Sequence, residues 1–112
     1  MVRPEERHWV RIRNGLYQDD LGVVEKYIDD SKIYVKLIPR VAPQKSKEAK
    51  MTFMRMPQNV FDEKEYPGGT RIKPNYFNKH FYSYKNNLYR KGFIYKTFGQ
   101  SPLFTIFCIF ET

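Results

Sequence analysis

Lysine and arginine residues interleaved with aromatic rings are the side chains of this sequence best suited to binding chemistry. Lys85, Arg90, Lys91 and Lys96 alternate with tyrosines within residues 80–98. Such cations neutralise phosphates and release counterions, and neighbouring rings can stack on unpaired bases. A half-buried sheet produces the same alternation, with rings inward and lysines outward. We therefore expect the charges to bind nucleic acid and most of the tyrosines to be structural.

The basic charge is concentrated in the second half of the chain. The 112 residues carry 20 Lys and Arg against 12 Asp and Glu, a net charge of +8. Residues 1–65 contain 13 basic and 11 acidic residues, whereas residues 66–110 contain seven basic residues and no acidic one. A field of one sign attracts polyanions, as in nucleic-acid-binding proteins. The competing interpretation is a charged surface that only keeps the domain soluble.

Two further groups of basic residues belong to the predicted binding surface. Arg11 and Arg13 alternate with apolar residues and should point outward, and Arg40 begins a basic connector. The sequence has no base-reading helix or fingerprint, so we expect contacts with the nucleic-acid backbone and little sequence preference. The complete set of predicted contacts is Arg11, Arg13, Arg40, Lys45, Lys47, Lys50, Arg55, Lys85, Arg90, Lys91 and Lys96.

The other polar residues form no recognisable catalytic or metal-binding set. Acidic pairs at residues 19–20 and 29–30 fall in predicted turns, where carboxylates cap backbone amides more often than they hold metal ions. His8 and His80 are isolated, and Cys108 lies in an apolar run where a thiol is usually inert. Catalysis needs a nucleophile, a base and an orienting group together. We therefore predict a protein that is not an enzyme and uses no cofactor or metal.

The composition also indicates the cellular setting. A single cysteine cannot form an internal disulfide, which suits a reducing compartment. No stretch reaches the roughly 18 to 20 apolar residues needed to span a bilayer, and the N-terminus lacks the apolar core of a secretory signal. We expect a soluble, intracellular monomer without membrane contact.

Residues 9–39 have the period-two alternation of three short β-strands, WVRIR, LGVVEKYI and KIYVKLIP. Gly15 lies in the first connecting turn, where a positive φ is useful. Gly22, inside the second strand, marks either a bulge or a close approach of another part of the chain. Pro39 ends the third strand. Three antiparallel strands of this length form most of a small SH3-like barrel, predicted here over residues 9–41 after an N-terminal arm of residues 1–8.

The remainder of the chain predicts a second structured segment. After a basic connector at residues 42–60, residues 61–98 contain a β-hairpin turning at residues 85–87 and an alternating run at residues 93–98. Residues 99–112 form a tail that is apolar over residues 103–110. Because an isolated hairpin is marginally stable in water, we expect it to pack on the barrel. The predicted fold is therefore mostly β, a small barrel and a hairpin linker subdomain forming one composite domain.

Three segments of the chain also resemble a known family. They are WVRIRNGLYQDDLGVVEKYIDDSKIYVKLIPR, MPQNVFDEKE and NNLYRKGFIYKTF, and together they cover about residues 9–98. They resemble the first KOW domain, and the linker after it, of the eukaryotic NusG-like elongation factor, the large subunit of DSIF. The matching barrel positions are Trp9, Gly15, Tyr17, Asp20, Leu21, Gly22, Leu37, Ile38, Pro39 and Arg40.

The resemblance implies a KOW barrel and a linker subdomain that act as one unit in transcription elongation. It implies a nuclear protein that lies near upstream DNA on RNA polymerase II and binds DNA or RNA through a basic surface. The connector is shorter than is typical of the family, and the tail after residue 98 departs from the family pattern. The 112 residues include nothing similar to the family's NusG N-terminal domain or its C-terminal repeats.

Two other functions remain open at this stage. One is a Tudor-like interaction barrel, in which Trp9, Tyr17, Tyr27 and Tyr34 would cage a methylated cation. The other is a structural spacer on the polymerase. Salt-sensitive binding to nucleic acid would distinguish a nucleic-acid-binding module from both of these functions.

Overall fold

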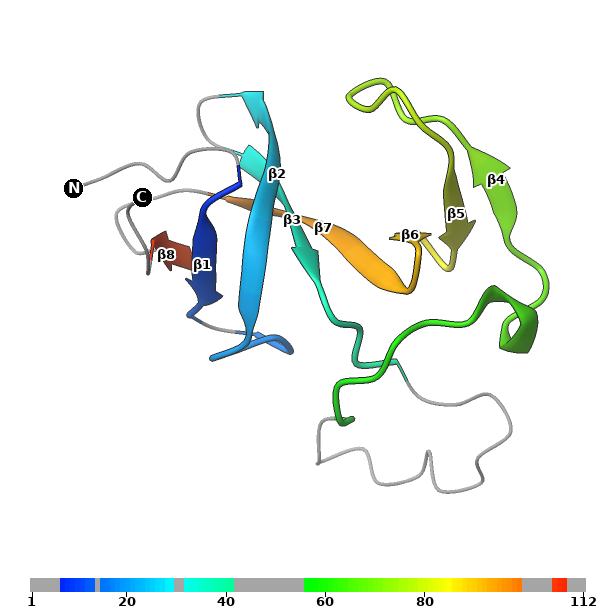
Figure 1. Cartoon of the computed structure of the whole chain (residues 1–112), viewed down its shortest axis with the longest axis horizontal. Helices are drawn as coiled ribbons and strands as arrows, with labels where there is room; N and C mark the ends of the chain where they lie inside the picture. Colours follow the sequence, from blue (N-terminus) through cyan, green and yellow to red (C-terminus); the bar gives the residue numbers. More distant parts are fainter. Residues whose placement is uncertain (1–6, 14, 30–31, 42–55, 100–105, 109–112) are drawn as a thin grey trace. The chain divides into compact units, whose positions relative to one another are not determined.

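The structure, a computed structural model, describes residues 7–13, 15–29, 32–41, 56–99 and 106–108. These residues belong to two compact units. The first unit comprises Met1–Leu37 and Tyr95–Thr112, and the second unit comprises Ile38–Ile94. Figure 1 shows that both units are built mainly from β-strands, which confirms the predicted mostly-β, KOW-like fold. No helix within the described ranges is long and apolar enough to cross a membrane.

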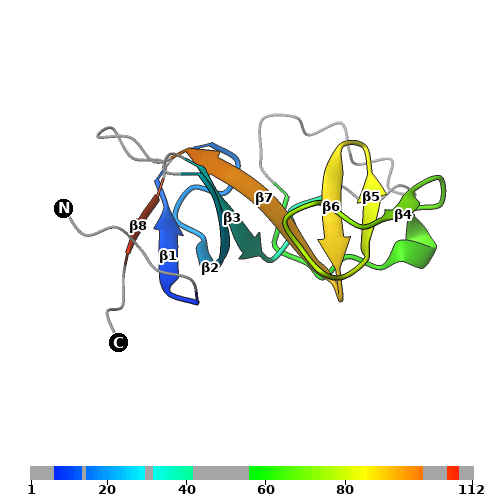
Figure 2. The same cartoon turned by 90° about the horizontal axis from the view of Figure 1, so that it is seen from above.

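The sheet of the first unit contains the three strands expected from the alternating sequence. They are β1 (Trp9–Ile12), β2 (Leu21–Asp29) and β3 (Lys32–Leu37), and antiparallel pairing joins β1 to β2 and β2 to β3. Two strands from the C-terminal part of the chain extend this sheet, namely β7 (Phe93–Gly99) beside β3 and β8 (Ile106–Cys108) beside β1. The strand order is therefore β7-β3-β2-β1-β8, as can be followed in Figure 2.

One face of β1, β2 and β3 forms the core of the first unit. Antiparallel pairing places Val10 opposite Gly22 and Val24 opposite Val35, so these residues point to the same side. Burying one such aliphatic side chain stabilises the fold by about 1.5 to 3 kcal/mol. The buried aliphatic residues of this face are Val10, Ile12, Val24, Ile33, Val35 and Leu37.

Gly22 lies where the neighbouring strand β3 leaves no room for a side chain. A Cβ atom at this position would be 2.5 Å from Cγ1 of Val35 and 2.7 Å from Cδ2 of Leu37. The register shifts of β2 occur further along, between Val24 and Lys26 and between Tyr27 and Asp29. Of the two roles considered for Gly22, the geometry therefore fits the close approach.

The second unit contains the predicted hairpin. Strands β5 (Phe81–Tyr84) and β6 (Asn87–Arg90) pair antiparallel, and both residues of the turn between them have positive φ, 48° at Lys85 and 66° at Asn86. This is the backbone of a two-residue turn that follows the twist of the strands. The short strand β4 (Thr70–Ile72) pairs with β5, and the first residues of β7 follow β6 in the strand order. A single 3-10 turn, η2 (Glu63–Glu65), precedes β4.

A stack of aromatic rings forms the core of the second unit. The ring of Phe61 lies between those of Tyr66 and Tyr89, with centroid distances of 4.7 Å and 3.7 Å and nearly parallel planes. Tyr84 meets Tyr66 edge to face at 5.5 Å. The hydroxyl of Tyr82 donates to the carbonyl of Tyr66 and accepts from the backbone N–H of Gly69. Aromatic residues therefore serve mainly as core here, as expected for the tyrosines.

The close approach at Gly22 predicts that Gly22→Val lowers the free energy of unfolding by about 1 to 3 kcal/mol, because the new side chain collides with Val35 and Leu37. Lys26→Val, which adds the same side chain at an exposed position of the same strand, should change it by no more than about 0.5 kcal/mol. Urea unfolding of both variants measures the difference. Equal stability of Gly22→Val and the unaltered chain would show that the space around Gly22 is not restrictive.

Candidate nucleic-acid interface

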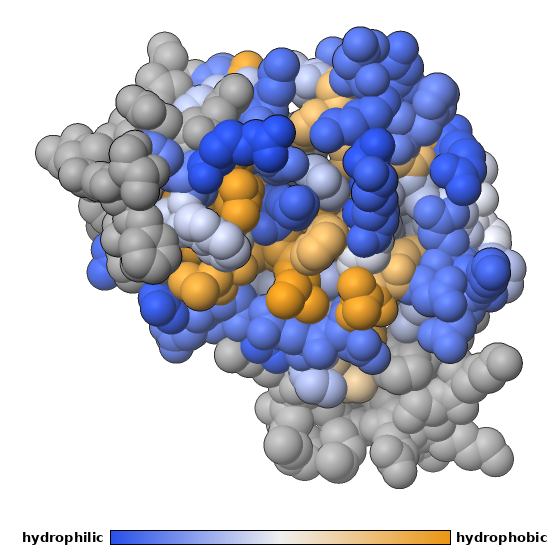
Figure 3. All heavy atoms as spheres, viewed as in Figure 1, coloured by the Kyte–Doolittle hydropathy of each residue, from blue (hydrophilic) through white to orange (hydrophobic). Residues whose placement is uncertain are grey.

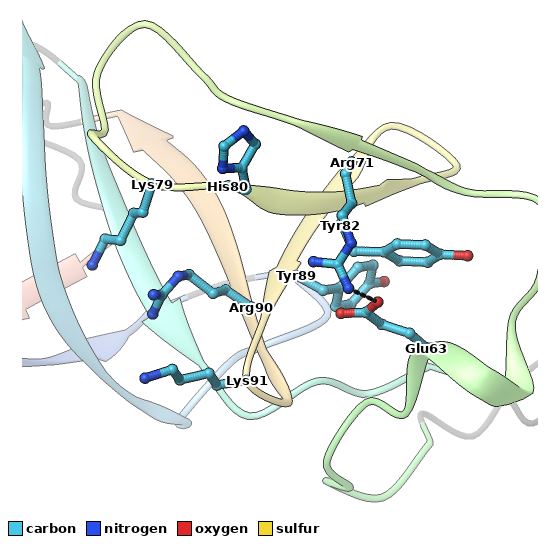
Figure 4. A pocket seen from close by; sticks show the side chains of 8 residues that line it. All are labelled: Glu63, Arg71, Lys79, His80, Tyr82, Tyr89, Arg90 and Lys91. Carbon is cyan, nitrogen blue, oxygen red and sulfur yellow. Dashed lines mark hydrogen bonds and ion pairs between the residues drawn. The ribbon is translucent and has the colours of Figure 1, made fainter.

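A basic hollow opens on the surface of the second unit. It has a volume of about 510 Å³ and is drawn in Figure 4. We call it the basic hollow, and its lining residues are Glu63, Arg71, Lys79, His80, Tyr82, Tyr89, Arg90 and Lys91.

Strand pairing accounts for the arrangement of part of this lining. Arg71 of β4 is the cross-strand partner of Tyr82 in β5, and Tyr82 is the partner of Tyr89 in β6. Directly paired residues point to the same face of a sheet, so an arginine and two tyrosines form one row across three strands. Tyr89 is also stacked on Phe61, which anchors the end of this row in the aromatic core.

The remaining cations of the basic hollow lie around its rim. Arg90 ends β6, and Lys91 follows it in a turn with a φ of 52°. The side chains of Lys79, Arg90 and Lys91 extend to the same side in Figure 4, away from Glu63. Three cations that extend together in this way can contact successive phosphates of a polyanion.

Glu63 is the acidic residue of this lining, and it forms an ion pair with Arg71. The carboxylate Oε1 of Glu63 lies 3.2 Å from Nη2 of Arg71, and their side chains are 37% and 67% exposed. An exposed pair of this kind contributes at most about 1 kcal/mol, so a phosphate can compete with the carboxylate for the guanidinium. The side chain of Asp62 accepts a hydrogen bond from the backbone N–H of Lys64 at 3.0 Å and so fixes the turn that carries Glu63.

Tyr66, in the aromatic core of the second unit, has a raised pKa. Burial, followed by the charge of Glu65 and the neighbouring Tyr84, raises the pKa of Tyr66 above its ordinary value. Because this phenol gains no charge at neutral pH, Tyr66 adds no negative potential to the second unit.

The residues predicted as nucleic-acid contacts are distributed over both units. In the second unit, Arg90 and Lys91 line the basic hollow, whereas Lys85 lies in the hairpin turn with its ammonium 5.5 Å from the centroid of the Tyr84 ring. In the first unit, Arg11 donates a 2.9 Å hydrogen bond to the carbonyl of Asp19, and the ammonium of Lys96 lies 6.0 Å from the Tyr17 ring. Arg13 is exposed immediately after β1.

Arg40 has a structural contact at the ends of the connector. Its Nη1 donates a 2.7 Å hydrogen bond to the carbonyl of Met56. The carbonyl of the fully buried Pro39 accepts a 2.9 Å hydrogen bond from the backbone N–H of Asn59. These two bonds hold residues 39 and 40 close to residues 56 and 59, near the end of the connector. The predicted contacts Lys45, Lys47, Lys50 and Arg55 lie outside the described residues.

Sequence reasoning missed Arg71, Lys79 and His80. Arg71 lies on a three-residue strand whose residues are all exposed, so no alternation of burial marks it. The sequence signal that could have identified these three residues is the charge distribution, because all of them fall within residues 66–110, which contain no acidic residue. Within the described part of the chain, no group of three or more His, Cys, Asp or Glu residues could hold a metal ion.

The aromatic cage considered for a methylated cation is not assembled in the first unit. Trp9 is 45% exposed, whereas Tyr17 is only 4% exposed and already has the ammonium of Lys96 over its ring. A cage needs its ring faces open toward one ligand. The geometry therefore favours the nucleic-acid hypothesis over the cage.

Comparisons with known proteins point to the same family that the sequence motifs resemble. Residues 3–105 match the family described as transcription elongation factor SPT5, KOW1 domain. A curated relative, transcription elongation factor SPT5 of Drosophila melanogaster, is 28% identical in an alignment 110 positions long that covers 87% of this chain. The matched region covers 10% of that relative, so the chain spans about a tenth of its length.

The Glu63–Arg71 ion pair predicts that Glu63→Gln raises the affinity for a polyanion such as inorganic polyphosphate by about two- to fivefold at low salt, because Arg71 loses its competing partner. Glu65→Gln is the matched control, since it makes the same charge change on the same turn outside the lining of the basic hollow. Isothermal titration of both variants measures the affinities. An equal gain for both would show that only net charge matters, and no gain for either would contradict anion binding here.

Proposed function

Because the chain belongs to the family of the SPT5 transcription elongation factor KOW1 domain, we propose that it is a non-catalytic nucleic-acid-binding module of a transcription elongation factor. The observation that carries this proposal is the basic hollow, in which Lys79, Arg90 and Lys91 extend to the same side and Arg71 also belongs to the lining. Glu63 is the acidic residue among the lining side chains, and it already pairs with Arg71. The net positive charge of the site suits a phosphate backbone.

The proposed mode of binding is contact with phosphates. Each lysine or arginine that neutralises a phosphate releases a counterion, which makes the affinity depend steeply on salt. Tyr89 is buried and stacked on Phe61, so its ring belongs to the core and is not available to stack on a base. Contacts of this kind carry little sequence information, and the module therefore binds DNA or RNA of many sequences.

The basic connector is proposed to supply additional contacts. The hydrogen bonds of Arg40 to Met56 and of Asn59 to Pro39 belong to the same unit as the basic hollow. The sequence between these anchored residues contains Lys45, Lys47, Lys50 and Arg55, and their positive charge suits the same polyanion.

The family supports the cellular role that we propose. We assign the module to the nucleus, beside RNA polymerase II, where it contacts upstream DNA or nascent RNA as a monomeric unit. The name of the Drosophila relative, transcription elongation factor SPT5, supports a role in elongation. The absence of a recognisable catalytic set in the sequence supports a binding function instead of an enzymatic one.

Charge reversal at the basic hollow tests this proposal. Arg90→Glu/Lys91→Glu should weaken binding to nucleic acid of any sequence, as should reversal of Lys45, Lys47 and Lys50, and the fold should remain intact. If about four phosphates are neutralised, the slope of log affinity against log salt is about −3 to −4, and each lost contact reduces it by about one unit or less. Fluorescence anisotropy at several salt concentrations measures both quantities.

The matched control is Lys32→Glu/Lys64→Glu, which makes the same change in net charge at two exposed positions outside the basic hollow. It should lose less affinity and keep a steeper slope than Arg90→Glu/Lys91→Glu. All variants are compared at equal melting temperature. Unchanged affinity and slope in the variants of the basic hollow and the connector would contradict the proposal and would favour a structural spacer.

A further inference from the structure

The outward face of the sheet in the first unit carries an exposed aromatic residue among cations. Strands β1, β2 and β3 bury one face, so the alternate residues point outward. Among the described residues, the large hydrophobic side chains left exposed include Trp9 and Leu21 of this sheet. Figure 3 shows one face of the molecule, where apolar side chains reach the surface between hydrophilic ones. We call the following residues the outer patch: Trp9, Arg11, Val23, Lys26, Tyr34 and Lys36.

The register of the strands places the outer patch on one side of the sheet. Trp9 pairs with Val23, and Val23 pairs with Lys36, which gives one row across β1, β2 and β3. Arg11 is two residues beyond Trp9 on the same strand and therefore shares its face. Strands two positions apart in a sheet are about 10 Å apart, so the flexible side chain of Lys36 can reach the backbone of a nucleotide whose base lies on Trp9.

A register shift adds the second row of the outer patch. Between Val24 and Lys26 the pairing of β2 with β3 is irregular, and beyond it Lys26 lies opposite Tyr34. Val24 is buried, whereas Lys26 is exposed. The irregularity therefore brings a second cation beside a second aromatic residue on the outward face.

The ring of Trp9 is accessible, unlike several tyrosines near basic residues. It is 45% exposed, whereas Tyr84, Tyr89 and Tyr95 are buried. The carboxylate Oε2 of Glu25 lies 3.9 Å from Nη1 of Arg7, and this ion pair offsets its negative charge. An exposed indole surrounded by cations can accept the flat face of a base while the cations neutralise the phosphates on either side.

We propose that the outer patch binds single-stranded nucleic acid, with an unpaired base stacked on Trp9 and its flanking phosphates on Arg11, Lys26 and Lys36. This inference rests on the proposed function and adds a ring-dependent site to the phosphate contacts of the basic hollow. A duplex keeps its bases stacked within the helix, so it cannot use the indole in this way. The outer patch therefore selects single strands.

The charge of the outer patch also argues against a methylated cation as the ligand. Such a ligand needs several ring faces around it and no competing positive charge. Here Trp9 is followed across the sheet by Val23 and Lys36, and Arg11 lies beside it on β1. These cations repel an alkylammonium group and attract a phosphate.

Trp9 is the single tryptophan of the chain, so its fluorescence reports on this site alone. Titration of the full chain with oligothymidylate should quench the indole emission, because the stacked base contacts the ring. An abasic strand of equal length should bind through its phosphates without this quenching and with an affinity about 5- to 20-fold lower. A duplex of equal length should also leave the emission unquenched.

Substitutions complete the test. Trp9→Ala should lower the affinity for oligothymidylate by about 5- to 20-fold and leave the affinity for the abasic strand unchanged, whereas Trp9→Phe should retain most of the affinity. Leu16→Ala, at another exposed apolar residue outside the outer patch, is the control and should change neither affinity. Melting temperatures establish that the variants are folded. The quenching titration uses the unaltered chain, so its result does not depend on the folding of any variant.

The outcomes separate the two proposals. Equal affinity for oligothymidylate and the abasic strand, with no quenching, would overturn the stacking site and leave the phosphate-binding function standing. Failure of both strands to bind would overturn both proposals. Quenching by a trimethyllysine peptide but not by oligothymidylate would overturn the stacking site in favour of a methylated cation.

Discussion

The placement of Phe61 between Tyr66 and Tyr89 is the interaction on which the second unit depends. The three rings join the segment before β4 to strand β6. The backbone N–H of Phe61 also donates a 2.9 Å hydrogen bond to the carbonyl of Gly92, which follows Lys91 in the turn after β6. A small unit has few residues with which to exclude water, and each ring buries a large apolar area while restricting few torsions. The position of the rim cations therefore follows from the aromatic core.

The two units use aromatic residues in different ways. In the second unit the rings are mostly buried and support cations, so recognition there is proposed to depend on charge alone. In the first unit the buried face of β1, β2 and β3 is mainly aliphatic, and the exposed Trp9 lies on the opposite face of the sheet. Because the two proposed sites recognise different parts of a nucleic acid, phosphates and unpaired bases, they can be tested separately. A protein that contacts both features would discriminate single strands from duplexes without reading sequence.

Local sequence signals predicted much of the fold. The alternation in β1, β2 and β3 gave their positions within a few residues, and the turn at residues 85–87 located the β5–β6 hairpin. Strand β4 carried no such signal because its three residues are all exposed, and the addition of β7 to the sheet beside β3 joins residues far apart in the sequence.

The candidate site was predicted only in part. Arg90 and Lys91 were identified from charge, but the pairing of Arg71 with Tyr82 depends on an unpredicted strand, and the predicted contact Arg40 is engaged by the carbonyl of Met56. The predicted division into barrel, connector and linker subdomain stays a prediction.

We propose that the basic hollow of the second unit receives the phosphates of a nucleic acid. Nuclear magnetic resonance tests it most directly, by following the backbone amide signals of the chain during titration with a short DNA duplex, whose paired bases cannot stack on Trp9. We expect the largest shifts at Arg71, Lys79, Arg90 and Lys91, and we expect added salt to reverse them. Shifts confined to the first unit, or the absence of shifts at a DNA concentration that saturates binding, would contradict it.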